Sequence, residues 1–385
     1  MPMPHPEIPL DPDLIYLNHA GVGPWTRAAG EAVRRFAEVN VARGAAEYPE
    51  WLAVERRLRE RLARLIGAGS ADDIALVKNT SEGLSLVAQG LDWRPGDNVV
   101  INDQEFPSNR MPWEALAASH GVEVREVRLD AAQSPEDALI AAMDARTRVL
   151  PVSAVQYATG LRLDLERLGQ ACADRGALFC VDAIQHLGAL PFDAAAVGAD
   201  FVVADGHKWM LGPEGLGVLY VHPDRREQLR LLQHGWHMAE AAGDYDRRDW
   251  TPASTARRFE PGSPNLLAAH ALEASLGVLE GQGMAAVGAA VQENVEHLLA
   301  RLDAEPALSA ITPSARERRA GIVTFRVAGA DGPALWRALR AEGVIAASRK
   351  GGIRFSPHFH NSPQDIDRAV DRVLALKDRP AAARG

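Results

Sequence analysis

A lysine follows a strongly apolar segment in the middle of the chain, a position suited to catalysis. The segment 201–217 reads FVVADGHKWMLGPEGLG, so a strand-like run ends near Asp205 and Lys208 precedes a glycine-rich turn. In a parallel sheet the ligand site lies beyond the carboxyl ends of the strands. A lysine held there in a desolvated pocket can lose its proton and form a Schiff base. Taken alone, however, a lysine at a strand end is more often an ordinary surface residue.

An aspartate at the end of another apolar run gives Lys208 a candidate partner. The segment 178–186 reads LFCVDAIQH, so its apolar run ends at Asp182, and Gln185 follows three residues later. Asp182 and Lys208 are 26 positions apart, which leaves room for one helix-and-strand unit between them. We therefore predict that both side chains face one pocket from neighbouring strand ends. Such a pair matches pyridoxal phosphate chemistry, in which the lysine holds the aldehyde and the aspartate keeps the pyridine nitrogen protonated. Taken alone, Asp182 is better explained as a cap of the next helix.

A third polar stretch lies where a strand-like run passes into a helix-like segment. Residues 78–83 read KNTSEG. The hydroxyl groups and free backbone N–H groups at such a helix start can bind a phosphate. The alternative is an ordinary helix cap supported by Glu82.

The elements that must position these residues alternate between short apolar runs and helix-like segments. Strand-like runs occupy residues 74–77, 98–101, 122–127, 149–152, 178–181, 201–204 and 217–221. Helix-like segments lie mostly between them, as at 81–91, 109–120 and 164–175. Apolar strands that alternate with helices indicate an α/β fold with a mostly parallel seven-stranded sheet covered on both faces.

The pattern changes after residue 264. Two helix-like segments are followed by short strands that mix with further helices, at 266–280, 285–303, 322–327, 333–342, 353–356 and 363–376. We expect a large cofactor-binding domain over residues 14–263 and a smaller α+β domain over 264–385 that also includes residues 1–13. Residues 224–258 are predicted to form a long irregular excursion.

Composition excludes several classes of protein. The chain has 385 residues, of which 47% are hydrophobic and 24% charged, which suits a packed protein of enzyme size. Its net charge of −9 argues against general binding to nucleic acid or to an anionic membrane. Cys172 and Cys180 are its two cysteines, so neither a disulfide framework nor a four-cysteine metal site is expected, and no metal is predicted. No apolar run approaches about 20 residues and no signal peptide is evident, so we expect a cytoplasmic protein.

Together these stretches resemble the class V aminotransferase superfamily of fold-type I pyridoxal phosphate enzymes, which includes cysteine desulfurases, selenocysteine lyases, kynureninases and epimerases. The resemblance runs from Tyr16 to the C-terminal helix. It implies that Lys208 binds the cofactor and moves a proton at the α-carbon of the substrate. It also implies that Asp182 pairs with the pyridinium nitrogen and that Gln185 hydrogen-bonds the phenolic oxygen of the ring.

The same resemblance assigns the remaining candidate residues. Thr80, Ser81 and His207 would hold the cofactor phosphate. Ser263, in the segment FEPGSPN, would reach the phosphate of a partner subunit, which implies a homodimer with shared active sites. Arg354, in GIRFS, would clamp the α-carboxylate of an amino-acid substrate by a bidentate contact. His19 is a further candidate for the substrate-binding mouth.

Two departures from the family pattern bear on the reaction. Phe106 stands where cysteine desulfurases carry a histidine, and it looks more like the kynureninases. A phenylalanine can stack on the cofactor ring but cannot transfer a proton. The desulfurase nucleophile is a cysteine on a loop before the carboxylate-binding arginine, but residues 347–352 read ASRKGG and contain no cysteine. In addition, Asp205 stands where the family often has serine or threonine near the phosphate, so we expect it to pair with a cation or to turn away.

These observations predict an enzyme that acts at the α- or β-carbon of an amino acid. We favour a lyase or desulfurase-like reaction on a cysteine-type or other β-substituted amino acid, without a cysteine persulfide relay. A class V aminotransferase or an amino-acid epimerase is the alternative. A non-catalytic binding protein with the same fold is a second alternative, which the intact set of Lys208, Asp182 and Arg354 disfavours.

Overall fold

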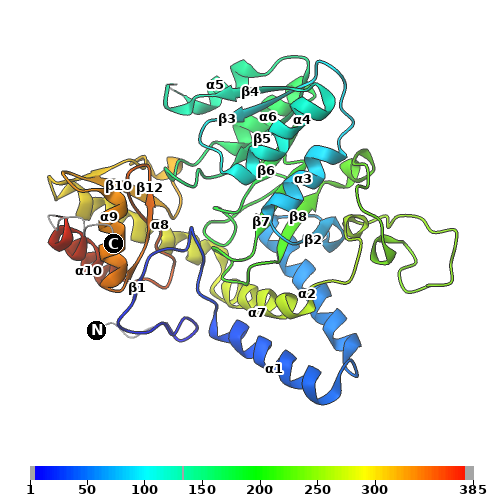
Figure 1. Ribbon diagram of the computed structural model, residues 1–385, viewed down its shortest axis with the longest axis horizontal. Coiled ribbons are helices and arrows are strands. Elements are labelled where there is room, and N and C mark those ends of the chain that lie inside the picture. The colour runs from blue at the N-terminus through cyan, green and yellow to red at the C-terminus, as the bar shows by residue number, and fades with distance from the viewer. Residues whose placement is uncertain (1–4, 132–133, 378–385) are drawn as a thin grey trace, which may run out of the picture.

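A computed structural model describes residues 5–131 and 134–377 of the chain. Two units are visible in Figure 1, a large one around a central sheet and a smaller one that contains the C-terminal helix. The ends of the predicted small domain, residues 1–4 and 378–385, lie outside the described residues.

The central sheet has seven strands, as the sequence predicts, and it is mostly parallel. Its strands are β2 (Ile74–Val77), β3 (Asn98–Asn102), β4 (Glu123–Val127), β5 (Thr147–Ser153), β6 (Leu178–Asp182), β7 (Phe201–Asp205) and β8 (Gly217–Val221). They lie in the order β2-β8-β7-β6-β5-β3-β4, and β8 alone runs antiparallel to its neighbours within this sheet. Every residue of β3, β6, β7 and β8 is buried, which explains why these strands read as continuous apolar runs.

Helices cover both faces of the sheet and supply two separate cores (Figure 1). The helices of the large unit are α1 (Arg27–Arg43), α2 (Tyr48–Ile66), α3 (Thr80–Gly90), α4 (Met111–His120), α5 (Pro135–Ala142), α6 (Leu165–Arg175) and α7 (Leu266–Gln282). Helices α2, α5, α6 and α7 contribute to one core, and α3 and α4 contribute to the other. The two cores fix the sheet from both sides and thereby hold the ends of its strands in place.

Close packing of α3 against the sheet depends on one glycine. A Cβ atom on Gly83 would come within 2.6 Å of the Val203 side chain on β7. Because no side chain separates them, the N-terminus of α3 lies close to the end of β7, and both contribute to the site described below.

The small unit is built around a four-stranded antiparallel sheet in the order β12-β13-β10-β9. Its elements are α8 (Met284–Asp303), β9 (Leu308–Ala310), β10 (Val323–Val327), α9 (Gly332–Ala341), β12 (Ala347–Arg349), β13 (Gly352–Phe355) and α10 (Pro363–Leu376). Separately, β1 (Ile15–Tyr16) pairs in parallel with β11 (Val344–Ile345), which ties the N-terminal segment to the small unit.

The packing of two helices bears on the border between the units. Helix α7 packs against α1 and α2, and its Leu272 and Leu276 belong to a core of the large unit. Within α8, Val291 contributes to that same core, whereas Val295 belongs to the core of the small unit. The border at residue 264 stays a prediction, and we propose one within α8 instead.

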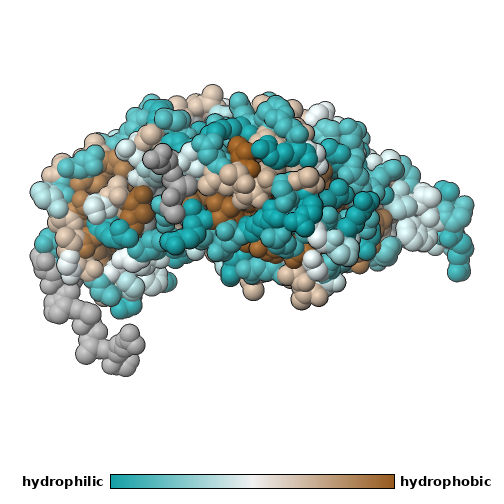
Figure 2. Space-filling model, turned by 90° about the horizontal axis from the view of Figure 1, so that it is seen from above, coloured by the Kyte–Doolittle hydropathy of each residue, from teal (hydrophilic) through white to brown (hydrophobic). Residues whose placement is uncertain are grey.

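Residues 224–258 form an irregular excursion, as predicted, with 3₁₀ turns but no α-helix or β-strand. It extends from the body of the large unit in Figure 1, and in Figure 2 one end of the molecule is a mostly hydrophilic projection. Trp236, Tyr245 and Trp250 are exposed on it.

None of the helices that the structure describes has the length and apolar character needed to span a membrane. Helices α7 and α8 pass that test as a pair, by length and composition, but they bend by 82° where they meet.

Candidate active site

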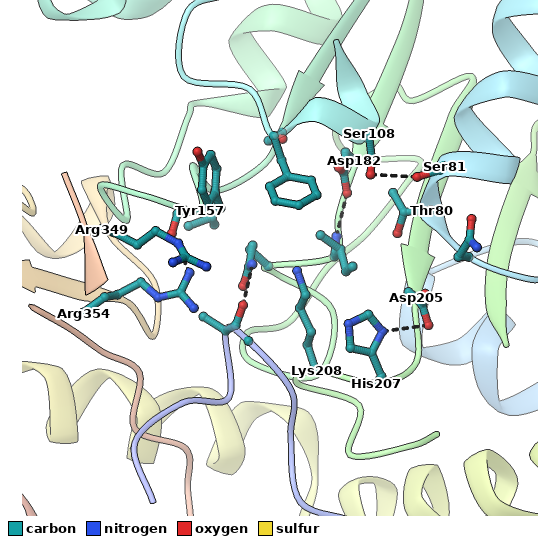
Figure 3. A pocket seen from close by; sticks show the side chains of 18 residues that line it. Thr80, Ser81, Ser108, Tyr157, Asp182, Asp205, His207, Lys208, Arg349 and Arg354 are labelled. Carbon is teal, nitrogen blue, oxygen red and sulfur yellow. Dashed lines mark hydrogen bonds and ion pairs between the residues drawn. The ribbon is translucent and has the colours of Figure 1, made fainter. Parts of the chain in front are cut away.

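A cavity of about 340 Å³ opens at the carboxyl ends of the central strands. Its walls come from the loops after β3, β5, β6 and β7, from the start of α3, from the N-terminal segment and from the β12–β13 hairpin. Figure 3 shows the lining side chains, with Lys208 in the middle of the group. The predicted site and the cavity therefore coincide at this edge of the sheet.

Asp182 and Lys208 face this cavity from neighbouring strands, as the sequence predicts. Strands β6 and β7 pair in parallel, Asp182 ends β6, and Lys208 follows the end of β7 by three residues. Burial lowers the pKa of Lys208 from 10.5 to about 8, although the charge of Asp182 opposes the shift. Burial also raises the pKa of Asp182 to about 7, and its Oδ1 accepts a hydrogen bond from the Ile184 N–H at 3.0 Å. The amine of Lys208 can therefore be neutral near physiological pH.

The turn that carries Lys208 is held by close backbone contacts. Gly23 donates a hydrogen bond from its N–H to the His207 carbonyl at 2.7 Å, and a Cβ atom on Gly23 would lie 2.2 Å from the Lys208 carbonyl. Leu211, three residues after Lys208, has a φ of 58°, a conformation that a branched side chain adopts at a cost of order 1–3 kcal/mol. The N-terminal segment and this strained turn together fix the direction of the lysine.

Hydroxyl and imidazole groups gather at one end of the cavity. Asn79 caps α3, and the hydroxyl of Thr80 is buried without a hydrogen-bond partner among the described residues. The Ser81 hydroxyl donates to Ser108 at 2.7 Å. The first N–H groups of a helix have no partner within the helix. This end of the cavity can therefore hold a phosphate.

Asp205 lies against His207 at the same end. Its Oδ1 is 2.9 Å from His207 Nδ1, which is within ion-pair distance, although the two atoms do not form a hydrogen bond. The neighbour of Asp205 is thus the His207 imidazole, whose other ring nitrogen remains for a ligand.

Phe106 and Gln185 also line the cavity. Phe106 is 41% exposed, and the Lys208 Nζ lies 5.7 Å from its ring centre. Glu105 beside it is buried and accepts hydrogen bonds from Ser153 and Asn109, which anchors the loop. Gln185 donates to the Ala20 carbonyl at 3.0 Å and accepts from the Trp209 indole at 2.8 Å, so its amide is fixed with one N–H remaining.

Two arginines reach the cavity from the small unit. Arg354 is 1% exposed and donates hydrogen bonds to the Tyr157 carbonyl at 2.8 Å and to Asn18 Oδ1 at 3.4 Å. Burial, and next the charge of Arg349, lower the pKa of Arg354 to about 9. Arg349 and Tyr157 line the cavity although the sequence analysis did not single them out. One feature of the sequence could have pointed to Arg349. It directly precedes the Lys-Gly turn of a short hairpin that also carries Arg354.

Two predicted site residues lie outside the cavity. His19 is fully buried and does not line it; its Nε2 is 3.0 Å from His360 Nε2, and its ring also contacts His358 and Trp209. The expectation that His19 borders the substrate mouth is therefore not met, because it packs within a cluster of rings. Ser263 is exposed and does not line the cavity of its own chain.

Neither cysteine reaches the cavity. Cys172 lies on α6 and Cys180 on β6, and both are buried. Burial raises the pKa of Cys172 to about 12 and also raises that of Cys180. Because a thiolate is the reactive form, both residues serve as core side chains.

The residues present fit pyridoxal phosphate. The unpartnered hydroxyl of Thr80, with Ser81 and His207, supplies donors for the phosphate. Asp182 keeps one carboxylate oxygen for the pyridine nitrogen, and Lys208 is an amine of lowered pKa placed for the aldehyde. Phe106 offers an apolar face for the ring. The donor set therefore matches each polar group of the cofactor.

Comparison with known proteins agrees with this geometry. A family model described as Aminotransferase class-V matches residues 15–368. The isopenicillin N epimerase of Streptomyces clavuligerus is 33% identical over 390 residues, which cover 95% of this chain and 96% of that protein. A probable cysteine desulfurase of Methanothermobacter thermautotrophicus is 37% identical over 277 residues, which cover 70% of this chain and 68% of that protein.

Solved structures show the same fold. The cystine C–S lyase C-DES, in complex with its reaction product cysteine persulfide, matches with a TM-score of 0.88 at 25% identity, over 94% of this chain and 97% of that chain. An apo cysteine desulfurase from Thermococcus onnurineus matches with a TM-score of 0.84 at 25% identity, over 96% of each chain. The chain belongs to the class V aminotransferase family and is a pyridoxal-phosphate-dependent enzyme of the fold-type I architecture.

Proposed function

We propose that the enzyme catalyses β-elimination from an amino acid that carries a leaving group on its β-carbon. The observation that carries the proposal is that Lys208, a base of lowered pKa, lines the cavity while both cysteines are buried elsewhere. A relay through a protein persulfide needs a thiol in the cavity, whereas direct elimination does not. C-DES, a structural relative, is described as a cystine C–S lyase, so sulfur is one candidate leaving atom.

The residues of the cavity divide the work. Arg354 binds the α-carboxylate of the substrate and thereby orients its α-carbon toward Lys208. The neutral amine of Lys208 accepts the α-proton, and the β-substituent leaves with its bonding electron pair. Pyridoxal phosphate, when bound, supplies the electron sink that makes this proton acidic. Asp182 would face the pyridine nitrogen of the bound cofactor, and Phe106 would lie against the ring without offering a proton.

Epimerisation is the second candidate. The isopenicillin N epimerase of Streptomyces clavuligerus aligns over almost the full length of both chains. Tyr157 also lines the cavity, and its phenol is the candidate for a second proton donor. An epimerase returns the proton to the other side of the α-carbon, so the two reactions share the step at Lys208 and differ afterwards.

One assay separates these reactions. Purified holoenzyme is incubated with β-chloro-L-alanine and, in deuterium oxide, with L-alanine. We expect pyruvate, ammonia and chloride from the first substrate, with a loss of at least about a thousandfold in Lys208→Ala. The double variant Cys172→Ser/Cys180→Ser is the control and should retain this activity. D-Alanine without pyruvate from chloroalanine would instead support epimerisation, and stoichiometric conversion of the cofactor to pyridoxamine phosphate would support transamination.

We also propose that the active unit is a homodimer. The exposed position of Ser263 supports this, because it is free to reach a second chain. Sedimentation should give twice the chain mass of 41.5 kDa, and Ser263→Ala should weaken binding of pyridoxal phosphate. A monomer that keeps full cofactor affinity would contradict the proposal. The cytoplasmic location stays a prediction.

A further inference from the structure

The β12–β13 hairpin brings two arginines to one wall of the cavity. Its turn, Lys350–Gly351, has φ values of 50° and 75°, as a tight two-residue hairpin requires. Arg349 pairs with Gly352, and Arg354 lies two residues beyond Gly352 on β13. Because side chains alternate along a strand, Arg349 and Arg354 lie on the same face as diagonal neighbours. Both line the cavity, and Figure 3 shows their guanidinium groups side by side.

Neither guanidinium has a carboxylate partner among the residues that the structure describes. The Nη1 of Arg349 donates to the Ser348 carbonyl at 2.7 Å, and its guanidinium carbon lies 5.9 Å from the Tyr157 ring centre. Arg354 donates to one carbonyl and one amide oxygen. The Nε groups of both are buried without a partner. Two adjacent positive charges without counter-charges are unfavourable and create a site that favours anions.

One anion does not account for both arginines. The α-carboxylate of an amino acid is satisfied by one guanidinium in a bidentate contact. The cofactor phosphate has its donors at the opposite side of the cavity, where Figure 3 shows Thr80, Ser81 and His207. Lys208 lies between the two groups. One of the two arginines is therefore left for a further acidic group.

The different burial of the two arginines assigns their roles. Arg354 is wholly buried, whereas Arg349 is half-buried and stacks beside Tyr157. A fully buried arginine suits the α-carboxylate, which every amino-acid substrate carries. An arginine nearer the solvent suits the side chain of the substrate, which differs from one amino acid to another. We propose that Arg349 binds an acidic group on the substrate side chain, so that the substrate is an amino acid whose β-substituent is itself anionic. This inference rests on the proposed function insofar as it assigns the α-carboxylate to Arg354.

The test uses ligands that cannot react, so that it is independent of turnover. Holoenzyme is titrated calorimetrically with succinate and glutarate and with their mono-amides, succinamate and glutaramate. Each pair has the same shape and differs by one charge. In the better pair we expect the dicarboxylate to bind at least about tenfold more tightly, as a charge-assisted hydrogen bond provides. Arg349→Met should remove this difference while leaving the mono-amide unchanged.

Two further variants make the result specific. Arg349→Lys keeps the charge but not the bidentate geometry, and it should retain part of the preference. Arg326→Met removes an exposed arginine from β10 of the same unit and should change nothing.

Three outcomes would overturn the proposal. Equal weakening of dicarboxylate and mono-amide by Arg349→Met would mean that both arginines share one carboxylate. No weakening of either, or no binding of either dicarboxylate to the wild type, would mean that Arg349 serves no second acidic group. Failure of β-elimination would appear separately as absence of pyruvate from chloroalanine, with the titrations still readable.

Discussion

Arg59 and the pair formed by Arg349 and Arg354 are arginines with restricted exposure whose surroundings differ. Arg59, on α2, donates hydrogen bonds to Glu55 at 2.5 Å and to Glu260 at 2.6 and 2.7 Å, and also to the Ile74 carbonyl. Although burial alone would lower the pKa of Arg59, the two carboxylates raise it overall. Arg349 and Arg354 have no carboxylate among the described residues. The charge of Arg59 is balanced by carboxylates of the protein itself. The charges of Arg349 and Arg354 are left to be balanced by a ligand.

The ion pairs of Arg59 also explain why we assign no metal site to the polar cluster around it. Glu55, His237 and Glu260 offer ligand atoms within 4.8 Å of one another, a spacing that a metal ion could use. However, Arg59 already forms ion pairs with both carboxylates. Glu260 also accepts the Leu76 N–H at 2.9 Å, so the cluster joins α2, β2 and the end of the excursion. We interpret it as a structural ion network.

The largest effect on stability is expected at Arg59. Arg59→Met leaves Glu55 and Glu260 buried without their cation, which should lower the free energy of unfolding by about 3–5 kcal/mol. Chemical denaturation of the holoenzyme measures this. Arg64→Met, which removes an exposed ion pair with Glu280, is the control and should cost less than about 1 kcal/mol. Equal decreases in the free energy of unfolding in both variants would contradict the distinction between a buried ion network at Arg59 and an exposed ion pair at Arg64.

Arg354→Met should show the opposite pattern. The variant should lose about a hundredfold in kcat/KM, equivalent to about 3 kcal/mol, because the substrate carboxylate loses its bidentate partner. Its stability should be unchanged or higher, since removing Arg354 relieves a buried charge next to Arg349. Steady-state kinetics and denaturation are measured on the same preparation. A destabilised variant with normal kinetics would place Arg354 with Arg59 as a structural residue.

A smaller effect concerns the pH dependence of cofactor binding. Burial lowers the pKa of Lys208 to about 8, and the amine must be neutral to react with the aldehyde. Reconstitution of cofactor-free protein should therefore accelerate about tenfold per pH unit below pH 8 and level off above it. Nα-acetyl-lysine, with an ordinary pKa, is the control and should continue to gain in rate at higher pH. If the rate for the protein also continued to rise above pH 8, Lys208 would not be desolvated.

The sequence predicts those parts of the site that follow from strand ends. Asp182 ends one apolar run and Lys208 shortly follows the end of the next, and parallel pairing of β6 and β7 brings them together. The alternation of helix and strand likewise predicts the sheet and its helices. The small unit is harder because its hairpin strands are short: β12 has three residues, and its apolar signal is weak. The sequence therefore predicts only a loop without a cysteine at Arg349.

The direction of a side chain and the partner of a helix depend on packing and not on the spacing of residues in the sequence. His19 lies near the N-terminal segment that borders the cavity, but its ring turns into a cluster with His358 and His360. The sequence contains no signal for that rotation. Similarly, the change of pattern near residue 264 predicts a border between the units. Helix α7, which follows this position, packs against α1 and α2 of the large unit.

The direct test of the account is to find which residue carries the cofactor. The chain contains four lysines, Lys78, Lys208, Lys350 and Lys377. Purified holoenzyme is reduced with borohydride, digested and mapped by mass spectrometry. We predict that the pyridoxyl phosphate label lies on Lys208 and disappears from the digest in Lys208→Ala. A label on another lysine, or no label on protein supplied with pyridoxal phosphate, would contradict the central claim that the cavity at the end of β7 is the active site.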